Sequence, residues 1–216
     1  MGRSLKFTTE KLIEATSATV ALTIDPRDTP ADEAGFINNG TLRAAGGLLA
    51  LSDGWYSNLA GVIETQGADA KVTFNSGAFI SQGVLRGSGG EFVVAAYPGN
   101  AATLRGVELE NATLRVQPNT ELALQRTIYT DGSTVALAGE ASRRAYVSLT
   151  EDVWLKGGGT VTLSESGNNI IGGIVPFGEF RRLNNDDNTI QGAGEIGSDT
   201  AGRLSISNGG TIEACH

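Results

Sequence analysis

The chain has 216 residues, of which 30 are glycine and only one is methionine, and its 16 basic and 24 acidic residues give a net charge of −8. Hydrophobic residues make up 40% and aromatic residues 6%, which predicts a folded chain whose core consists of small and branched aliphatic side chains. An acidic chain without a Lys/Arg cluster is a poor partner for nucleic-acid phosphates and for anionic membrane surfaces. No apolar run approaches the roughly 20 residues that span a bilayer.

The N-terminal residues differ from the rest of the chain. Residues 1–6 lack the apolar core of a signal peptide, so any export signal is missing from this sequence. Residues 8–15 predict one or two helical turns with threonine as the N-cap, and residues 19–24 alternate as a strand. We expect residues 1–34 to form a capping segment that covers the first layer of a repeat structure.

A short repeat begins after this segment. Segments of the form Gly-x-(Leu/Ile)-x start at Gly40, Gly61 and Gly83, with a looser copy at Gly106, so the repeat is about 22 residues long. Apolar and polar residues alternate within each copy, and turn residues separate the copies. Short strands bounded by turns within such a repeat are typical of one coil of a β-helix. We therefore predict an all-β, right-handed parallel β-helix over residues 35–216.

The repeat also predicts which residues stack on one another. One inward ladder is expected from Leu42, Ile63 and Leu85, and a second from Leu51, Val72 and Val94. On the outward side, the residue after each member of the first ladder gives a column of alternating charge that comprises Arg43, Glu64 and Arg86. Leucine-rich repeats share the period, but their strand spacing fits only once, at Leu104-x-x-Val107-x-Leu109.

After about residue 115 the spacing loosens, which predicts coils with inserted loops. Two such loops are expected at residues 140–144 and 176–188. Residues 208–214 repeat residues 38–44 almost position for position, which indicates the start of a new coil. An uncovered parallel layer at that end would favour self-association through the C-terminal coil. Cys215 lies there and allows no disulfide within the chain because it is the only cysteine.

The search for catalytic groups yields little. The only histidine is the terminal His216, so a conventional Ser-His-Asp or Cys-His arrangement is not expected. Glycosidases need paired carboxylates, and the best pair is Glu108 and Glu110, which would share one strand face as an ordinary surface pair also would. Trp55 and Tyr56 lie beside a turn, where they act either as a plug or as a binding surface. These four residues form the candidate ligand surface.

Other motifs point away from bound cofactors and metals. Asn184-Asn185-Asp186-Asp187-Asn188 offers oxygen donors but lacks the spacing of known calcium loops, so a solvated loop or an asparagine stack is expected. The glycine pairs lack the strand-to-helix context of phosphate loops. An ice-binding face needs regular threonine arrays on a flat surface, and Thr160 with Thr162 is one such pair, but the neighbouring coils do not continue it. We expect no cofactor and no metal.

Three segments carry a family resemblance: residues 38–42, residues 157–164 and residues 187–197, the last of which contains the phrase Asn-Thr-Ile-x-Gly-x-Gly. In them the chain resembles the glycine-rich β-strand repeat regions of large secreted bacterial adhesins, of the filamentous-haemagglutinin and autotransporter-passenger type. The resemblance implies an extracellular or cell-surface location, a structural or adhesive role, and host-surface or matrix glycans or proteins as partners. We expect a non-catalytic segment without nucleic-acid binding or membrane insertion. The alternative is a carbohydrate-active β-helix, lyase-like or glycosidase-like, or a glycan-binding module.

Overall fold

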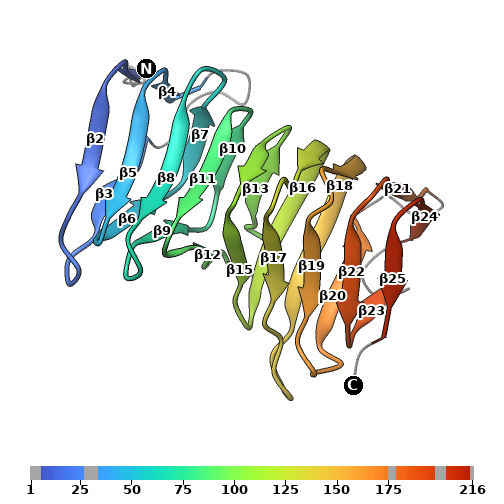
Figure 1. Cartoon of the computed structure of the whole chain (residues 1–216). Helices are drawn as coiled ribbons and strands as arrows, with labels where there is room; N and C mark the ends of the chain where they lie inside the picture. Colours follow the sequence, from blue (N-terminus) through green and yellow to red (C-terminus); the bar gives the residue numbers. More distant parts are fainter. Residues whose placement is uncertain (1–5, 27–33, 175–178, 198–202, 215–216) are drawn as a thin grey trace.

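The computed structural model describes residues 6–26, 34–174, 179–197 and 203–214, and every regular element in these ranges is a β-strand. The strands stack in parallel about 24 residues apart. They form an elongated β-solenoid with the chain termini near opposite ends (Figure 1). The predicted all-β, parallel solenoid is confirmed, with a repeat slightly longer than expected.

Most coils contribute three strands, and these stack into three faces. The first two faces belong to one 16-stranded sheet, and the third is a separate sheet. The first face contains β1 (Phe7–Thr9), β4 (Phe36–Asn38), β7 (Gly54–Ser57), β10 (Ala78–Ser81), β13 (Ala102–Arg105), β20 (Asn169–Gly173) and β23 (Glu195–Ile196). The second face contains β2 (Leu12–Ala15), β5 (Thr41–Ala45), β8 (Val62–Gln66), β11 (Val84–Ser88), β14 (Glu108–Glu110), β21 (Arg181–Asn185) and β24 (Leu204–Asn208). Two long strands, β16 (Thr120–Tyr129) and β18 (Ala145–Lys156), run through both faces.

The third face is a nine-stranded sheet. It contains β3 (Leu22–Ile24), β6 (Leu48–Leu51), β9 (Lys71–Phe74), β12 (Glu91–Val94), β15 (Thr113–Val116), β17 (Thr134–Leu137), β19 (Thr160–Leu163), β22 (Thr189–Gly192) and β25 (Thr211–Glu213). Its consecutive strands pair without a register shift from β15 to β25. The first two faces, by contrast, have a register shift between Leu124 and Arg126, where β16 pairs with β18.

The strand alternation seen in the sequence produces the core. In β8, Ile63 has no exposed surface, and it pairs with Leu42 in the preceding coil and with Leu85 in the following one. Leu42 and Leu85 are also fully buried, so the first predicted ladder is confirmed. Gly61, which begins the repeat here, sits so close to the coil below that a Cβ atom would lie 2.5 Å from the carbonyl oxygen of Asn38.

The second predicted ladder is wrong in its register, although all its members are buried. Leu51 stacks on Phe74, and Val72 stacks on Leu49 instead. The reason is turn length: residues 46–47 connect β5 to β6, whereas residues 67–70 connect β8 to β9. Two additional turn residues shift the third-face strand by two positions, which preserves the inward face but changes the stacking partner.

The expected helix near the N-terminus is also wrong. Residues 8–15 contribute to the strands β1 and β2, which pair with β4 and β5 and so form a coil of the solenoid. Phe7 stacks on Phe36 with ring centroids 5.1 Å apart. The edge of β4 and β5 offers backbone hydrogen bonds that outweigh a weak local helix preference. Residues 1–5 and 27–33 of the expected cap lie outside the described residues.

The second half departs from the prediction in two places. Residues 140–143 form the expected loop, closed by an isolated bridge between Glu140 and Arg143. Within the second predicted loop, however, Arg181–Asn185 is the strand β21, while residues 175–178 lie outside the described residues. Thr211–Glu213 is the third strand of the last described coil and does not start a new one. The repeated Asn-x-Gly-Thr phrase forms a corner between two strands. At residues 38–41 this corner lies between the first and second faces, whereas at residues 208–211 it lies between the second and third faces.

Candidate functional site

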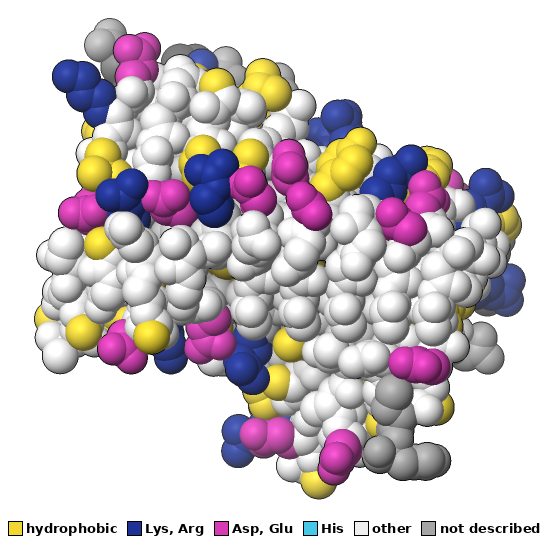
Figure 2. All heavy atoms as spheres, in the orientation of Figure 1, with side chains coloured by type: hydrophobic (Ala, Val, Ile, Leu, Met, Phe, Trp, Pro, Cys, Tyr) yellow, Lys and Arg dark blue, Asp and Glu magenta, His cyan; other side chains and the backbone are white. Residues whose placement is uncertain are grey.

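A row of charged side chains follows the outward side of the second face. Arg43 places Nη1 3.2 Å from Glu14 Oε1 and donates a hydrogen bond from Nε to Glu64. Farther along, Arg86 Nε lies 2.6 Å from Glu110 Oε2. The predicted alternating column is confirmed, and Figure 2 shows it as a row of magenta and dark blue groups across the molecule. The hydrogen bond with Glu64 raises the pKa of the Arg43 guanidinium. Burial lowers this pKa by less than Glu64 raises it, and Glu14 raises it further.

The carboxylate pair has the predicted orientation. Glu108 and Glu110 project from the outward side of β14 on either side of the buried Leu109. Glu110 is bonded to Arg86 in the preceding coil, whereas Glu108 lies opposite Tyr129 in the following coil. The structure therefore places Glu110 beside a guanidinium, as a link between coils.

A separate cluster of charged side chains lies on the third face, around Glu91. Glu91 is 3.4 Å from Lys71 Nζ and 2.9 Å from Arg115 Nε, so it joins β9 to β15 across β12. Burial alone would raise the pKa of Glu91, but the hydrogen bond from Arg115 and the contact with Lys71 outweigh burial and lower it. Glu91 is thus stabilised as a carboxylate by both neighbours.

The two aromatic residues beside the turn point to opposite sides of β7. Tyr56 is only 1% exposed, and its hydroxyl lies 2.6 Å from the carbonyl oxygens of Ile24 and Ser52. Burial raises the pKa of Tyr56 far above its ordinary value. Tyr56 is therefore a core residue and not part of a ligand surface. Trp55 is half-buried, and its ring meets Phe79 edge-on at 5.6 Å with an unpaired, buried Nε1.

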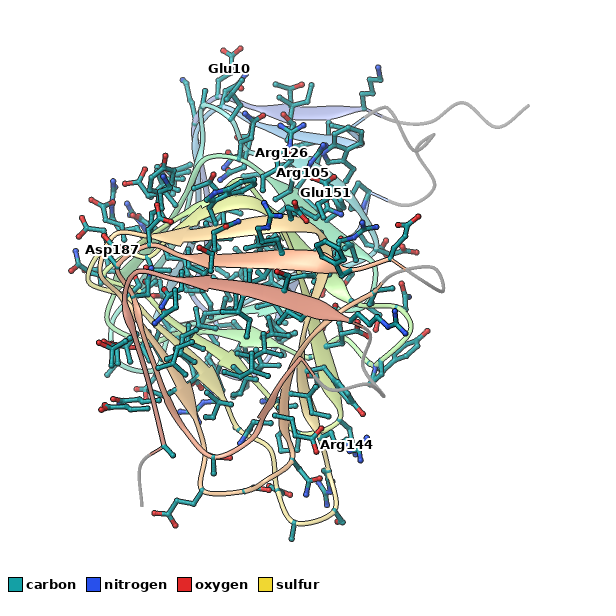
Figure 3. The ribbon with its side chains drawn as sticks, turned by 90° about the vertical axis from the view of Figure 1, so that its right-hand side faces the viewer. Glu10, Arg105, Arg126, Arg144, Glu151 and Asp187 are labelled. Atoms are coloured by element: carbon teal, nitrogen blue, oxygen red, sulfur yellow. The ribbon has the colours of Figure 1, made fainter. Side chains whose placement is uncertain are left out.

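The other charged residues that the structure describes are spread over several parts of the solenoid. Arg105 Nη2 lies 3.6 Å from Glu151 Oε1, and Figure 3 shows Arg126 near this pair. The same view places Asp187 and Arg144 on other sides of the solenoid. Within the ranges that the structure describes, no group of three or more His, Cys, Asp or Glu side chains could hold a metal ion. Cys215 and His216 lie outside those ranges.

Asparagine side chains connect the coils at two corners. Asn38 Nδ2 donates to Asn58 Oδ1 at 2.7 Å, and Asn185 Nδ2 donates to Asn208 Oδ1 at the same distance. Asn188 is fully buried and accepts a hydrogen bond from Thr130. The expected asparagine stack in residues 184–188 is thus present.

A threonine column on the third face was not recognised in the sequence. Thr160 does have counterparts in the neighbouring coils, contrary to the expectation above. The register aligns one outward threonine in each of five consecutive strands: Thr113, Thr134, Thr160, Thr189 and Thr211. In the sequence each is followed by Leu, Val or Ile, but the uneven spacing hides the column. The Thr162 column does not continue, since Ala136 and Gln191 flank it.

No protein-family model, curated protein or solved structure matches the chain. The resemblance to bacterial adhesins consequently has support from the β-solenoid architecture alone. Among the described residues, no helix is long and apolar enough to cross a membrane.

Proposed function

We propose that this chain is a non-catalytic, structural or adhesive β-solenoid segment of a secreted or cell-surface bacterial protein. The observation that carries the proposal is a series of ion pairs that link successive coils along the solenoid axis. Arg43 bonds to Glu14 and Glu64 in the coils on either side, and Glu110 is bonded to Arg86. Such cross-strand pairs fix the register of neighbouring coils. A carboxylate that accepts hydrogen bonds from a guanidinium is also poorly placed to exchange protons with a substrate.

A carbohydrate-active or glycan-binding solenoid is the second candidate. The half-buried Trp55, packed edge-on against Phe79, favours glycan binding because an indole ring offers an apolar face to a sugar. Catalysis is less well supported. Glycosidases place two carboxyl groups on either side of the scissile bond, whereas Glu108 and Glu110 project from the same side of one strand.

The two candidates are separated by a turnover assay. The chain is incubated with pectins, alginates and neutral glycans, with and without calcium, and product release is measured. We expect none. Product release that is abolished by Glu108→Gln or Glu110→Gln, but retained with Glu165→Gln at an exposed turn, would establish the catalytic alternative.

The proposed partners are glycans or proteins of a host surface or matrix. Arrays of both, probed with the labelled chain, test this adhesive role. If the first face carries adhesion, Trp55→Ala should reduce binding, while Trp154→Ala on the second face should not. Equal loss in both variants would contradict a binding surface on the first face, and no binding by the native chain would leave only the structural role.

A further inference from the structure

We propose that the third face, over β17, β19 and β22, binds the surface of ice through its aligned threonine hydroxyls. This inference goes beyond the structural or adhesive role and does not depend on it. Thr134, Thr160 and Thr189 lie directly opposite one another in the parallel sheet. Neighbouring strands lie about 4.7–4.9 Å apart, so the backbone imposes that repeat on the hydroxyl groups.

These hydroxyls are free to bind an external partner. In the described part of the chain, none of the five threonines of the column has a side-chain hydrogen bond to another protein group. All five are half-buried or exposed at the surface. Threonine is β-branched and therefore stiff at χ1, so the hydroxyls of successive strands can keep one orientation without a large entropic cost on binding.

The outward positions beside the three central threonines of the column are neutral. The second outward residue of the three central strands is Ala136, Thr162 or Gln191, and charge returns only at the flanking strands, with Arg115 and Glu213. Figure 2 shows this part of the surface almost without charged groups, below the row of alternating charge. A neutral face excludes recognition based on phosphate or carboxylate charge.

The chemistry of the face fits an ordered water lattice. Hexagonal ice presents water oxygens at a fixed repeat close to the spacing of β-strands. A hydroxyl both donates and accepts hydrogen bonds, so it can replace a lattice water. A glycan site would instead be expected to offer aromatic rings for stacking, and the outward positions of β17, β19 and β22 contain none.

The experiment measures partition of the fluorescently labelled chain into slowly growing ice, together with inhibition of ice recrystallisation. A non-binding globular protein is the reference. We expect the native chain to enter the ice above the reference level. Thr160→Tyr, which places a bulky ring at the centre of the array, should reduce partition to that level. Thr160→Val, which replaces the hydroxyl group with a methyl group of similar size, should also reduce it.

The matched control is Thr73→Tyr, an outward threonine of the same sheet in β9 that lies outside the column. It should partition like the native chain. Thermal melts check that the variants are folded, and Thr134→Tyr replaces Thr160→Tyr if the latter unfolds. Partition of the native chain at the reference level, or unchanged partition of Thr160→Val or of a folded tyrosine variant, would overturn the proposal. So would glycan-array binding that is lost in Thr160→Tyr without any ice binding.

Discussion

Ile63 in β8 lies directly beside Leu85 in β11, and neither side chain has any exposed surface. We predict that Ile63→Asp destabilises the chain by about 4 kcal/mol or more, because it buries an unpaired charge in a narrow core. Thr41→Asp, on the outward side of β5, should change stability by less than about 1 kcal/mol. Urea melts of both variants measure the difference, and equal losses would contradict the inward assignment.

The second prediction concerns the contribution of the charge column to stability. Arg43→Glu places three carboxylates in succession, at positions 14, 43 and 64, and should cost roughly 0.5–1 kcal/mol or more because like charges directly opposite are destabilising. The double variant Arg43→Glu/Glu14→Arg restores the opposite-charge pair between positions 14 and 43 and should recover part of the loss. Both effects should shrink at high salt. A loss that is insensitive to salt would indicate packing as its cause.

The asparagine stack makes a third prediction, with a control one residue away. Asn38 is 1% exposed, donates to Asn58 and Val62, and accepts from the Gly40 N–H. Asn38→Ala leaves these buried groups unpaired and should cost about 1–3 kcal/mol. Asn39→Ala changes an exposed side chain and should have little effect. Chemical denaturation of the two variants measures the contrast, and comparable losses would rule out the stack as its source.

Glu91 makes a pH-dependent prediction. Its pKa is lowered in the folded chain by Arg115 and Lys71, against the effect of burial. A group with a depressed folded pKa contributes stability above its unfolded pKa, and this stability is lost as the pH falls through the folded pKa. Glu91→Gln should therefore destabilise the chain at neutral pH and much less at acidic pH. Melts across that range test the sign, and a loss that grows on acidification would contradict it.

The last prediction concerns self-association through the outer edge of β25. Ile206 and Ile212 are 42% and 41% exposed in the last described coil. Within the described ranges β25 pairs with β22 alone, and an open parallel edge is a template for another strand. We predict that the chain self-associates through this coil in the presence of reductant. Light scattering should detect concentration-dependent association that Ile212→Lys weakens. A strictly monomeric chain at high concentration would refute this prediction.

The sequence alone determined the repeat, the inward position of Ile63 and the alternation of Arg43 with Glu64. These properties follow from a period of two, which each strand carries in its own residues. For residues 184–188 sequence reasoning left a solvated loop and an asparagine stack as alternatives, and the structure shows the stack. Sequence reasoning did not determine the side of Tyr56, since adjacent residues of a strand face opposite ways and both Trp55 and Tyr56 suit a core.

Only the tertiary structure decided which residues lie beside one another in successive coils. Val72 pairs with Leu49, and Thr160 pairs with Thr134 and Thr189, because the turns between strands differ in length. Strand pairing aligns backbone hydrogen bonds and the inward side chains, while the turns absorb the extra residues. A fixed offset along the sequence therefore misses the threonine column. The physical reason is that hydrogen bonding and core packing hold the strands of each face in register, whereas the number of residues in each coil can vary through its turns.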